Sequence, residues 1–316
     1  MTNTLRICIT GGTGFVGRHL SARLAAAGHT LLLPTRHPDS ARALNVLPSV
    51  RLLAADIHDR GTLDRLFTGC DAVINLVGIL NERRRGDFHR AHVELTAGIV
   101  AAAEAAGVRR LLQMSSLRAD ADDAPSNYLR SKGEAERAVA AATALDWTIF
   151  QPSVIFGRDD SFINRFADLM RLSPLLPLAR PNARFAPVWV EDVAKAMKHS
   201  LTAPATHGQT LQLCGPQVYS LRELVNYIRA ATGAAGITLN LPDGLARLQA
   251  RALQLLPGKP FTMDNYRSMT VHSICERNGF EVLGLKPRSL EGVAPSFLGD
   301  GGRNSRFSRL RRSAGR

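Results

Sequence analysis

Long apolar runs are missing from this chain of 316 residues, although apolar residues make up 45% of it. None of its apolar stretches approaches the roughly 18 residues that a membrane-spanning helix needs. The first residues, MTNTLR, lack the charged segment and apolar core of a secretory signal. We therefore expect a globular protein of the cytoplasm, with any membrane contact limited to the periphery at the inner face.

Cysteine is scarce, and its four copies form no metal-binding pattern. They are Cys8, Cys70, Cys214 and Cys275. An even count would permit two disulfide bonds, but Cys8 and Cys70 fall in or beside predicted buried strands, and we expect reduced thiols. His89 and His92 lie three residues apart on a predicted helix, yet no acid or cysteine at a suitable spacing completes a site. We predict that no metal is bound.

Acidic residues are too few to balance the basic ones, and the formal net charge is +13. Part of the excess is local, because the segment 299–316 holds six arginines and one acid, Asp300. Its other residues are largely glycine and serine, so we predict a disordered tail that is dispensable for folding. Such a tail contacts anionic surfaces more often than it reads a nucleotide sequence, and we expect no specific nucleic-acid partner.

The stretch around which the chain is organised reads ICITGGTGFVG, from Ile7 to Gly17. A buried strand, a turn with Gly11, Gly14 and Gly17, and a segment with apolar residues at helical spacing follow one another. This order points a helix N-terminus at whatever lies over the turn, and free N–H groups there favour a pyrophosphate. The three glycines suit the tight turn, the close approach of phosphate and the helix–strand packing.

The residues after the second predicted strand, 29–36, distinguish between dinucleotide cofactors. An acid at this point usually holds the ribose 2′-hydroxyl of NAD, whereas an arginine suits the 2′-phosphate of NADP. The chain carries Arg36 here, and Asp39 comes only after Pro38. The pattern favours NADP(H) over NAD(H), unless Arg36 is merely a solvated surface charge.

Apolar strands alternate with helical segments over the first half of the chain. The strands are predicted at 7–10, 29–36, 50–55, 71–77, 108–114 and 146–150. Continuous apolar strands separated by helices imply a parallel sheet that is covered on both faces. We predict an α/β fold, a Rossmann-type doubly wound parallel sheet with a smaller C-terminal substrate lobe. The predicted domains are an NAD(P)-binding domain over 1–157, a partly interleaved lobe over 158–298 and the tail.

A tyrosine and a lysine four residues apart, Tyr128 and Lys132, share one face of a predicted helix. A lysine ammonium beside a phenol favours the phenolate, so the tyrosine can exchange a proton with a carbonyl or alcohol. The pattern YxxxK alone usually marks a solvated helix face. Its place one helix after the fifth strand of a sheet with a glycine turn makes it specific.

Several motifs together resemble a known family. They are GGTGFVG, Asp56, NLVG at 75–78, the serines at 115–116, YLRSK, QPSVIFG, FAPVWVEDVA and PGKPFTMDNYRSM at 257–269. The chain resembles the atypical and extended short-chain dehydrogenase/reductases of the NAD-dependent epimerase/dehydratase family. Within it, the chain looks like bacterial relatives of the nucleotide-binding accessory subunit of respiratory complex I.

The resemblance implies a set of cofactor residues. At the pyrophosphate they are Gly11, Thr13, Gly14, Phe15, Val16 and Gly17, and at the adenosine end Arg36, Asp56 and Ile57. Along the nicotinamide ribose they are Leu76, Val77, Gly78 and Ser115, and Pro152, Ser153, Val154 and Ile155 would close over the nicotinamide. Tyr128 and Lys132 would form the catalytic pair and would also contact the cofactor.

Two departures from the family's pattern affect the predicted activity. Active members usually carry serine or threonine as the third residue after the fifth strand, where this chain has Leu117. Ser116 is the candidate substitute if the turn shifts. The asparagine that those enzymes carry on the preceding helix is replaced by His92. Loss of one donor to the developing oxyanion often costs about two to four kcal/mol.

Three functions are consistent with the sequence. The first is an NADP(H)-dependent reductase or epimerase of a small or lipid-like substrate, linked to respiratory-chain or quinone metabolism. The second is a cofactor-holding accessory or assembly protein of a membrane NADH:quinone oxidoreductase, and the third a nucleic-acid partner that uses the basic tail. Neither the substrate nor the oligomeric state follows from the sequence.

The segment from Leu169 to Pro181 is rich in leucine and is interrupted by Pro174 and Pro177. The prolines predict a loop instead of a regular helix. Arg171 and Arg180 lie within this loop, so we expect it to line the substrate mouth or to contact an anionic membrane or the respiratory complex.

Overall fold

The computed structural model describes residues 4–298 of the chain. These residues divide into two compact units, and each unit contains more than one stretch of sequence. The first runs to Pro152 and also includes Glu191–Leu213 and Glu276–Lys286. The second comprises Ser153–Val190, Cys214–Cys275 and the residues from Pro287 onward. The predicted tail, 299–316, lies outside the described residues.

The first unit is built on a seven-stranded sheet in which every strand pairs in parallel with its neighbours, in the order β11-β6-β5-β4-β1-β2-β3. The strands are β1 (Arg6–Thr10), β2 (Thr30–Thr35), β3 (Val50–Ala54), β4 (Ala72–Asn75), β5 (Arg110–Met114), β6 (Asp146–Pro152) and β11 (Gln209–Leu213). β1, β4 and β5 are almost wholly buried, as is the middle of β6, which agrees with their largely apolar sequences. The predicted Rossmann-type doubly wound sheet is confirmed.

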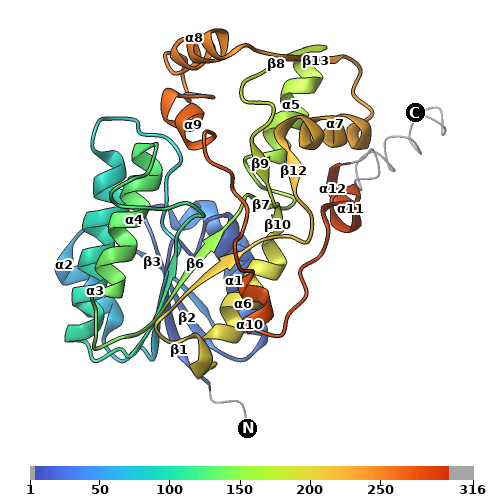
Figure 1. Ribbon diagram of the computed structural model, residues 1–316. Coiled ribbons are helices and arrows are strands. Elements are labelled where there is room, and N and C mark those ends of the chain that lie inside the picture. The colour runs from blue at the N-terminus through green and yellow to red at the C-terminus, as the bar shows by residue number, and fades with distance from the viewer. Residues whose placement is uncertain (1–3, 299–316) are drawn as a thin grey trace. The chain divides into compact units, whose positions relative to one another are not determined.

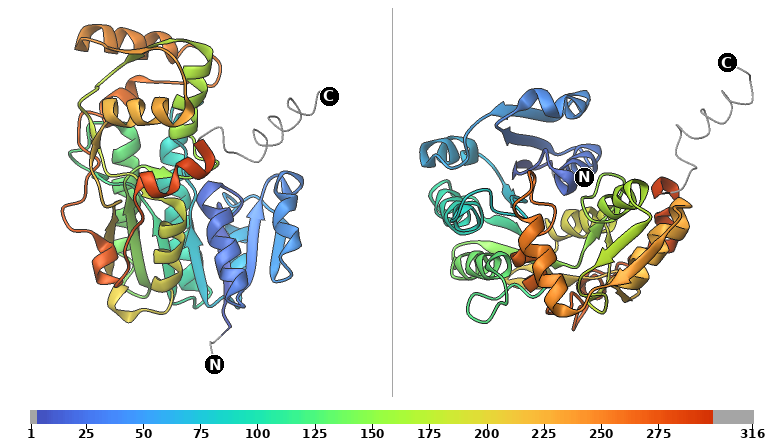
Figure 2. Two further views of the ribbon diagram at one scale, coloured as in Figure 1. Left: turned by 90° about the vertical axis from the view of Figure 1, so that its right-hand side faces the viewer. Right: turned by 90° about the horizontal axis from the view of Figure 1, so that it is seen from above.

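Helices cover both faces of this sheet (Figures 1 and 2). They are α1 (Phe15–Ala26), η1 (Pro38–Val46), α2 (Arg60–Phe67), η2 (His89–Glu94), α3 (Leu95–Ala105), α4 (Asn127–Ala140), α6 (Val190–Ser200), η3 (Pro204–Thr206) and α10 (Gly279–Val282). Leu63, Ile99 and Val139 from α2, α3 and α4 pack in one buried cluster with strand residues. α1 and α6 lie on the other face. Glu191 of α6 bonds to His19 and Arg23 of α1.

The second unit consists of short strands and helices around its own apolar core. The strands are β7 (Ile155–Phe156), β8 (Leu175–Leu178), β9 (Arg184–Phe185), β10 (Val188–Trp189), β12 (Tyr219–Ser220) and β13 (Ile237–Asn240). The helices are α5 (Ile163–Leu172), α7 (Leu221–Thr232), α8 (Asp243–Leu253), α9 (Met263–Ser268), α11 (Leu290–Val293) and α12 (Pro295–Leu298). Ser220 and Glu223 form a capping box at the start of α7.

Two features of the structure differ from the sequence-based expectations. β11, expected in the smaller lobe, is the seventh strand of the main sheet and pairs with β6. The predicted loop 169–181 is instead the end of α5 followed by β8, with Met170, Leu176 and Leu178 in the core. The loop prediction was wrong because a partner strand, β13, holds this segment in place.

The cysteines also differ from the prediction. Cys214 and Cys275 form a disulfide bond, whereas Cys8 and Cys70 are free and buried as expected. The two bonded cysteines are the first and last residues of the segment Cys214–Cys275 of the second unit. The bond therefore joins the two ends of this segment, which lie 61 residues apart in sequence. Burial raises the pKa of both free thiols, which keeps them protonated and unreactive.

Within the described residues, no helix combines the length and apolar character required to cross a membrane.

Candidate functional site

The glycine turn lies against the end of β4. Gly11 has a positive φ of 74°, and a side chain there would lie 3.0 Å from the backbone of Leu76 and Val77. At Gly17, a Cβ atom would come within 2.5 Å of the carbonyl oxygens of Gly11 and Gly12. The backbone is therefore packed so closely that only glycine fits at these two positions. The turn holds the start of α1 directly beyond the carboxyl ends of β1 and β4.

The N-terminus of α1 has no side-chain cap. Gly14 is the N-cap residue, no side chain accepts a hydrogen bond there, and no acid occupies the first turn. Thr13, Phe15 and Val16 complete this turn and are all partly exposed. Backbone N–H groups without a cap, together with the helix dipole, create a site for a phosphate group. The geometry fits the pyrophosphate that the sequence predicts at these residues.

Basic groups surround the ends of β2 and β3. Arg36 follows β2 and is exposed, whereas Asp39 forms an ion pair with Arg42 at 2.8 Å. Burial lowers the pKa of His58, and the positive charges of Arg90 and Arg36 lower it further. Arg90 belongs to the π-helical turn η2 and was missed by the sequence analysis, because nothing in the local pattern connects η2 with β3.

Asp56 and Ile57 follow β3, as predicted for residues beside an adenine. The carboxylate of Asp56 accepts a hydrogen bond from the backbone of His58 at 3.0 Å, which shapes the turn after the strand. Ile57 packs against the buried cluster beneath α2 and α3 and is half-buried.

Asn75 organises the end of β4 and was also missed as a site residue. Its amide donates to Gln113 at 3.0 Å, and its carbonyl oxygen accepts from the hydroxyl of Thr10 at 2.8 Å and from the backbone of Val77 at 3.1 Å. These bonds join β1, β4 and β5 at their carboxyl ends. They fix the backbone at Leu76 and Val77, two of the predicted nicotinamide-ribose residues.

Lys132 reaches the same edge of the sheet from α4. Its side chain is 4% exposed, and its ammonium group donates to the carbonyl oxygens of Val77 at 3.4 Å and Met114 at 3.3 Å. A side chain at Gly78 would lie 3.1 Å from the lysine nitrogen, so this glycine leaves room for the ammonium group. Burial lowers the pKa of Lys132 to about 8, whereas Glu136 opposes the shift.

Tyr128 lies one helical turn before Lys132 and is half-buried. Its ring makes edge contacts with Phe88 and His92, with centroids 5.9 and 5.7 Å apart. These two rings hold the tyrosine on the face of α4 that also carries Lys132. The predicted pair therefore shares one helix face at the ligand edge of a parallel sheet.

His92 is a neutral structural residue. Its Nε2 atom accepts a hydrogen bond from the backbone of Ile79 at 3.1 Å, so the proton lies on Nδ1, which donates to Ser131 at 2.8 Å. Burial and the charge of Lys132 lower its pKa to about 2. His92 thus ties the loop after β4 to α4. The described residues contain no group of three or more His, Cys, Asp or Glu side chains that could hold a metal ion.

The two serines after β5 precede the position at which related enzymes carry serine or threonine, and Leu117 occupies that position. Ser115 is buried, and Ser116 is half-buried with its hydroxyl 3.5 Å from the carbonyl oxygen of Leu117. Leu117 is 2% exposed, and its backbone donates to Pro152 at 3.1 Å. The turn keeps the register that places leucine at the third position. Ser116, directly before Leu117, is the hydroxyl residue nearest in sequence to that third position.

The remaining predicted residues, Ser153, Val154 and Ile155, belong to the second unit. The hydroxyl of Ser153 donates to the carbonyl oxygen of Ser273 at 2.7 Å and accepts from the backbone of Ala186 at 3.1 Å. Ser153 therefore joins three segments within that unit. Ile155 pairs with Val188.

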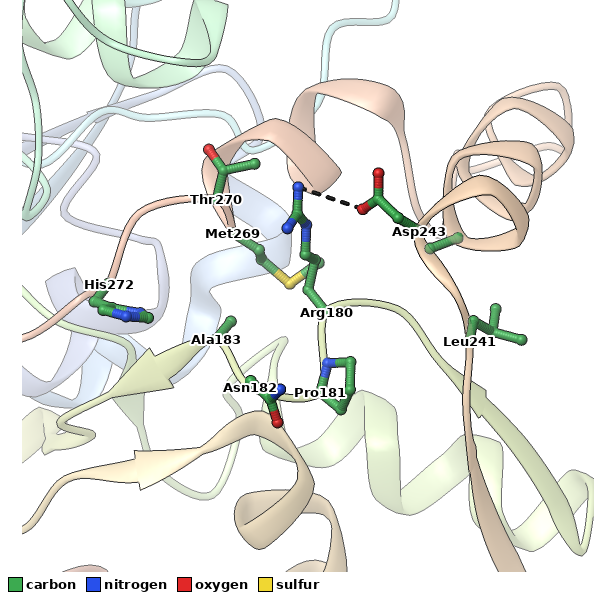
Figure 3. A pocket seen from close by; sticks show the side chains of 10 residues that line it. Arg180, Pro181, Asn182, Ala183, Leu241, Asp243, Met269, Thr270 and His272 are labelled. Atoms are coloured by element: carbon green, nitrogen blue, oxygen red, sulfur yellow. Dashed lines mark ion pairs between the residues drawn. The ribbon is translucent and has the colours of Figure 1, made fainter.

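A cavity of about 300 Å³ lies within the second unit (Figure 3). Arg180 enters it with a positive φ of 51° and pairs with Asp243 at 3.5 Å. The guanidinium also lies 4.8 Å from the ring centre of Tyr266, which bonds to Asp243. Leu241 and Met269 supply apolar walls. No local sequence pattern predicted this cavity, since its walls come from stretches far apart in the chain.

The chain is similar to known NAD(P)H-binding proteins. A family model described as NAD(P)H-binding matches residues 11–166. The chain is 30% identical to the mitochondrial NADH dehydrogenase (ubiquinone) 1 alpha subcomplex subunit 9 of Rattus norvegicus, over 90% of this chain and 77% of the relative. It is 32% identical to the ceramide reductase of Caulobacter vibrioides, over 75% of this chain and 74% of the relative.

Among solved structures, the UDP-glucose 4-epimerase of Thermotoga maritima is similar in fold. Its TM-score is 0.75 at 16% identity, over 97% of this chain and the whole of that one. The likeness extends beyond the sheet and covers residues of both units.

Proposed function

Because this chain belongs to the NAD(P)H-binding atypical short-chain dehydrogenase/reductases that include complex I alpha subcomplex subunit 9, we propose that it is an NADPH-dependent reductase of a carbonyl group. The observation that carries this proposal is the buried ammonium group of Lys132, held at the ends of β4 and β5 on the same helix face as Tyr128. Burial of a lysine ammonium group without a charged partner costs free energy, so its presence here indicates a functional role.

The glycine turn and the uncapped start of α1 fit the cofactor's pyrophosphate, and Leu76, Val77 and Gly78 line the edge where its ribose would lie. When bound, the cofactor supplies hydride. Tyr128 donates a proton to the carbonyl oxygen of the substrate, and Lys132 lowers the energy of the phenolate that remains. His92 and Phe88 orient the tyrosine ring, and Asn75 holds the strand end in place.

We assign NADP(H) as the preferred cofactor. Arg36 is exposed at the end of β2, and Arg90 adds a second positive charge near His58. The carboxylate that could hold a ribose 2′-hydroxyl, Asp39, is engaged by Arg42. A 2′-phosphate would therefore meet positive charge at this end of the sheet, whereas a 2′-hydroxyl would find no acceptor at β2.

A lipid-like ketone is the substrate class that we propose. The ceramide reductase relative acts, by its name, on a lipid, and the two chains match over three quarters of their lengths. The cavity of the second unit combines the Arg180 charge with apolar walls, which suits a molecule with a polar end and a hydrocarbon part.

A second function, a cofactor-holding accessory role at a respiratory complex, is favoured by one specific observation. Leu117 occupies the position of the usual serine or threonine, its side chain has no hydrogen-bond donor, and its backbone N–H group is bonded to Pro152. The similarity to complex I subunits supports the same role. Contact with such a complex, at the inner face of the membrane, is part of this second proposal.

Tyr128→Phe tests the reductase function. With NADPH and ketones of graded chain length, loss of the proton donor should lower kcat about 100-fold or more, and NADPH affinity should change little. Tyr227→Phe, a half-buried tyrosine of α7, is the matched control and should leave kcat unchanged. The measurement is the loss of NADPH absorbance.

If no ketone is reduced while NADPH still binds, the accessory role is favoured. Equal turnover by wild-type protein and Tyr128→Phe would reject Tyr128 as the proton donor.

A further inference from the structure

Helix α8 presents its large apolar residues outward. Ala246 and Ala250, four residues apart, face the unit and are fully buried, where they pack with Tyr266 and Ala179. Leu245 and Leu248 lie on the other side and are 53% and 60% exposed. Leu255, just after the helix, continues this side at helical spacing and is 83% exposed. The helix therefore buries its small residues and leaves its leucines uncovered.

The outer face of a small sheet adjoins this helix. β8 and β13 pair in parallel with Leu175 beside Ile237 and Pro177 beside Leu239. All four of these residues are exposed, whereas Leu176 and Leu178 point into the core. Gln249 of α8 donates to the carbonyl oxygen of Pro177 at 3.2 Å, so helix and sheet are directly joined. Figure 1 shows α8 at one end of the second unit, near β8 and β13.

Most exposed large apolar residues of the described chain belong to this one region. They are Leu175, Ile237, Leu239, Leu245, Leu248, Leu255 and Leu256. Single exposed apolar side chains are ordinary, but a concentration of this size marks a contact surface.

The charges around the leucines are basic. From Gly244 to Met263 the chain carries Arg247, Arg251 and Lys259 and no acidic residue. Arg247 pairs with Asp243 at the start of the helix, where Arg180 also lies. A leucine face bordered by arginines is typical of helices that lie in the plane of a lipid interface. Two copies of this surface would instead bring like charges together, which disfavours self-association.

We propose that this surface, formed by α8, Leu255, Leu256 and the outer face of β8 and β13, lies on a membrane that carries anionic lipid. The leucines enter the boundary between headgroups and acyl chains, and Arg251 and Lys259 contact lipid phosphates. Of the predicted loop 169–181, the surface includes only the exposed residues of β8, Leu175 and Pro177, because Leu176 and Leu178 are in the core. It is also separate from the cofactor residues of the first unit, so this proposal does not depend on the proposed reductase activity.

Vesicle flotation of the intact protein tests the proposal, with phosphatidylcholine vesicles compared to vesicles that also contain phosphatidylglycerol. The protein should float with the anionic vesicles and lose binding as salt is added. Leu245→Ser with Leu248→Ser should lower the partition coefficient about tenfold or more. Arg251→Gln should lower it about fivefold.

The matched control is Val46→Ser with Val282→Ser, which removes two exposed apolar side chains of the first unit and should leave binding unchanged. Thermal unfolding verifies that each variant folds, and Leu255→Ser, outside the helix, is the alternative if the double variant does not. NADPH affinity should stay the same in all of them.

Three results would overturn the proposal. The first is wild-type protein that binds neither vesicle, and the second is leucine variants that bind as wild type does. The third is a result in which the leucine variants float as wild type does but differ from it in oligomeric state, as measured by light scattering. That result would show that a second copy of the chain covers this surface. Equal binding to both vesicle types would overturn the role of the charges.

Discussion

At the scale of single residues, the site depends on two buried titratable groups that stabilise each other's positions. Lys132 is held by two carbonyl oxygens, and its charge helps to keep His92 neutral. His92 in turn connects the backbone of Ile79 to Ser131 on α4. The residue pattern of the sequence predicted Lys132 as a catalytic and cofactor residue but gave His92 only as a departure from the family.

His92 should make the folded state sensitive to acid. Its pKa is about 2 in the folded protein and about 6.5 when the chain is unfolded, so the unfolded chain binds more protons between these values. Stability should therefore fall as pH drops below about 6.5, by up to roughly 1.4 kcal/mol per pH unit from this residue. Denaturant unfolding at a series of pH values should show a shallower acid loss in His92→Gln than in wild type.

Because burial also lowers the pKa of His29 and His58, the wild-type curve contains their contributions. The difference in pH dependence of unfolding between wild type and His92→Gln gives the contribution of His92 alone. If the two curves run parallel from neutral pH to pH 5, His92 is not held neutral by its surroundings.

Arg36 should determine cofactor preference. Arg36→Ala should weaken NADPH binding about tenfold, because a charge-assisted contact with a phosphate contributes roughly 1.5 kcal/mol or more. NADH affinity should remain within a factor of two or so. Calorimetric titration of both cofactors measures this, with Arg42→Ala as a control that removes a neighbouring arginine paired to Asp39. Equal affinities for both cofactors before and after the change would contradict the assignment.

At the scale of elements, β8 shows that pairing with a distant strand, β13, can give a segment a structure that its own sequence does not predict. Pro174 and Pro177 break any helix in this segment, and the sequence alone therefore predicts a loop. Pro177 is compatible with β8 because the two-stranded sheet leaves edges where an N–H group is not needed. Alternation then decides exposure, so that Leu176 is buried and Leu175 is not.

Alanine at these two neighbouring positions should give very different results. Leu176→Ala should lower the free energy of unfolding by about 2 to 5 kcal/mol, because it leaves a space in the core of the second unit. Leu175→Ala should change it by about 0.5 kcal/mol or less. Chemical denaturation of both variants is the measurement, and similar losses for the two would contradict the register of β8.

At the scale of the whole molecule, the two units have different means of stabilisation. The first has a continuous seven-stranded sheet, whereas the second has short strands, a separate core and the bond between Cys214 and Cys275. The predicted cofactor residues up to Lys132 all belong to the first unit. Changes in the second unit that spare Ser153, Val154 and Ile155 should therefore leave dinucleotide binding intact.

Replacing both bonded cysteines tests this separation. Cys214→Ser with Cys275→Ser should lower stability by about 2 to 4 kcal/mol, because a cross-link over a long loop restricts the unfolded chain. The affinity for NADPH should not change. Thermal unfolding with and without a thiol reductant is the measurement, since the reductant should affect wild type and leave the double variant unaltered.

A reductant that leaves the unfolding of wild type unchanged would mean that the bond contributes nothing to stability. A loss of NADPH binding in the double variant would mean that the first unit depends on it.

The sequence by itself determined the features that arise from neighbouring residues. The strand, glycine turn and start of α1 follow from local spacing, as does the common helix face of Tyr128 and Lys132, because both depend on contacts within a few residues. The tertiary structure alone decided which distant segments meet. It placed β11 in the main sheet, joined Cys214 to Cys275, brought Arg90 toward the ends of β2 and β3, and left the leucines of α8 exposed. Periodicity shows that a helix has an apolar side, but only the packing of Ala246 and Ala250 shows which side the fold covers.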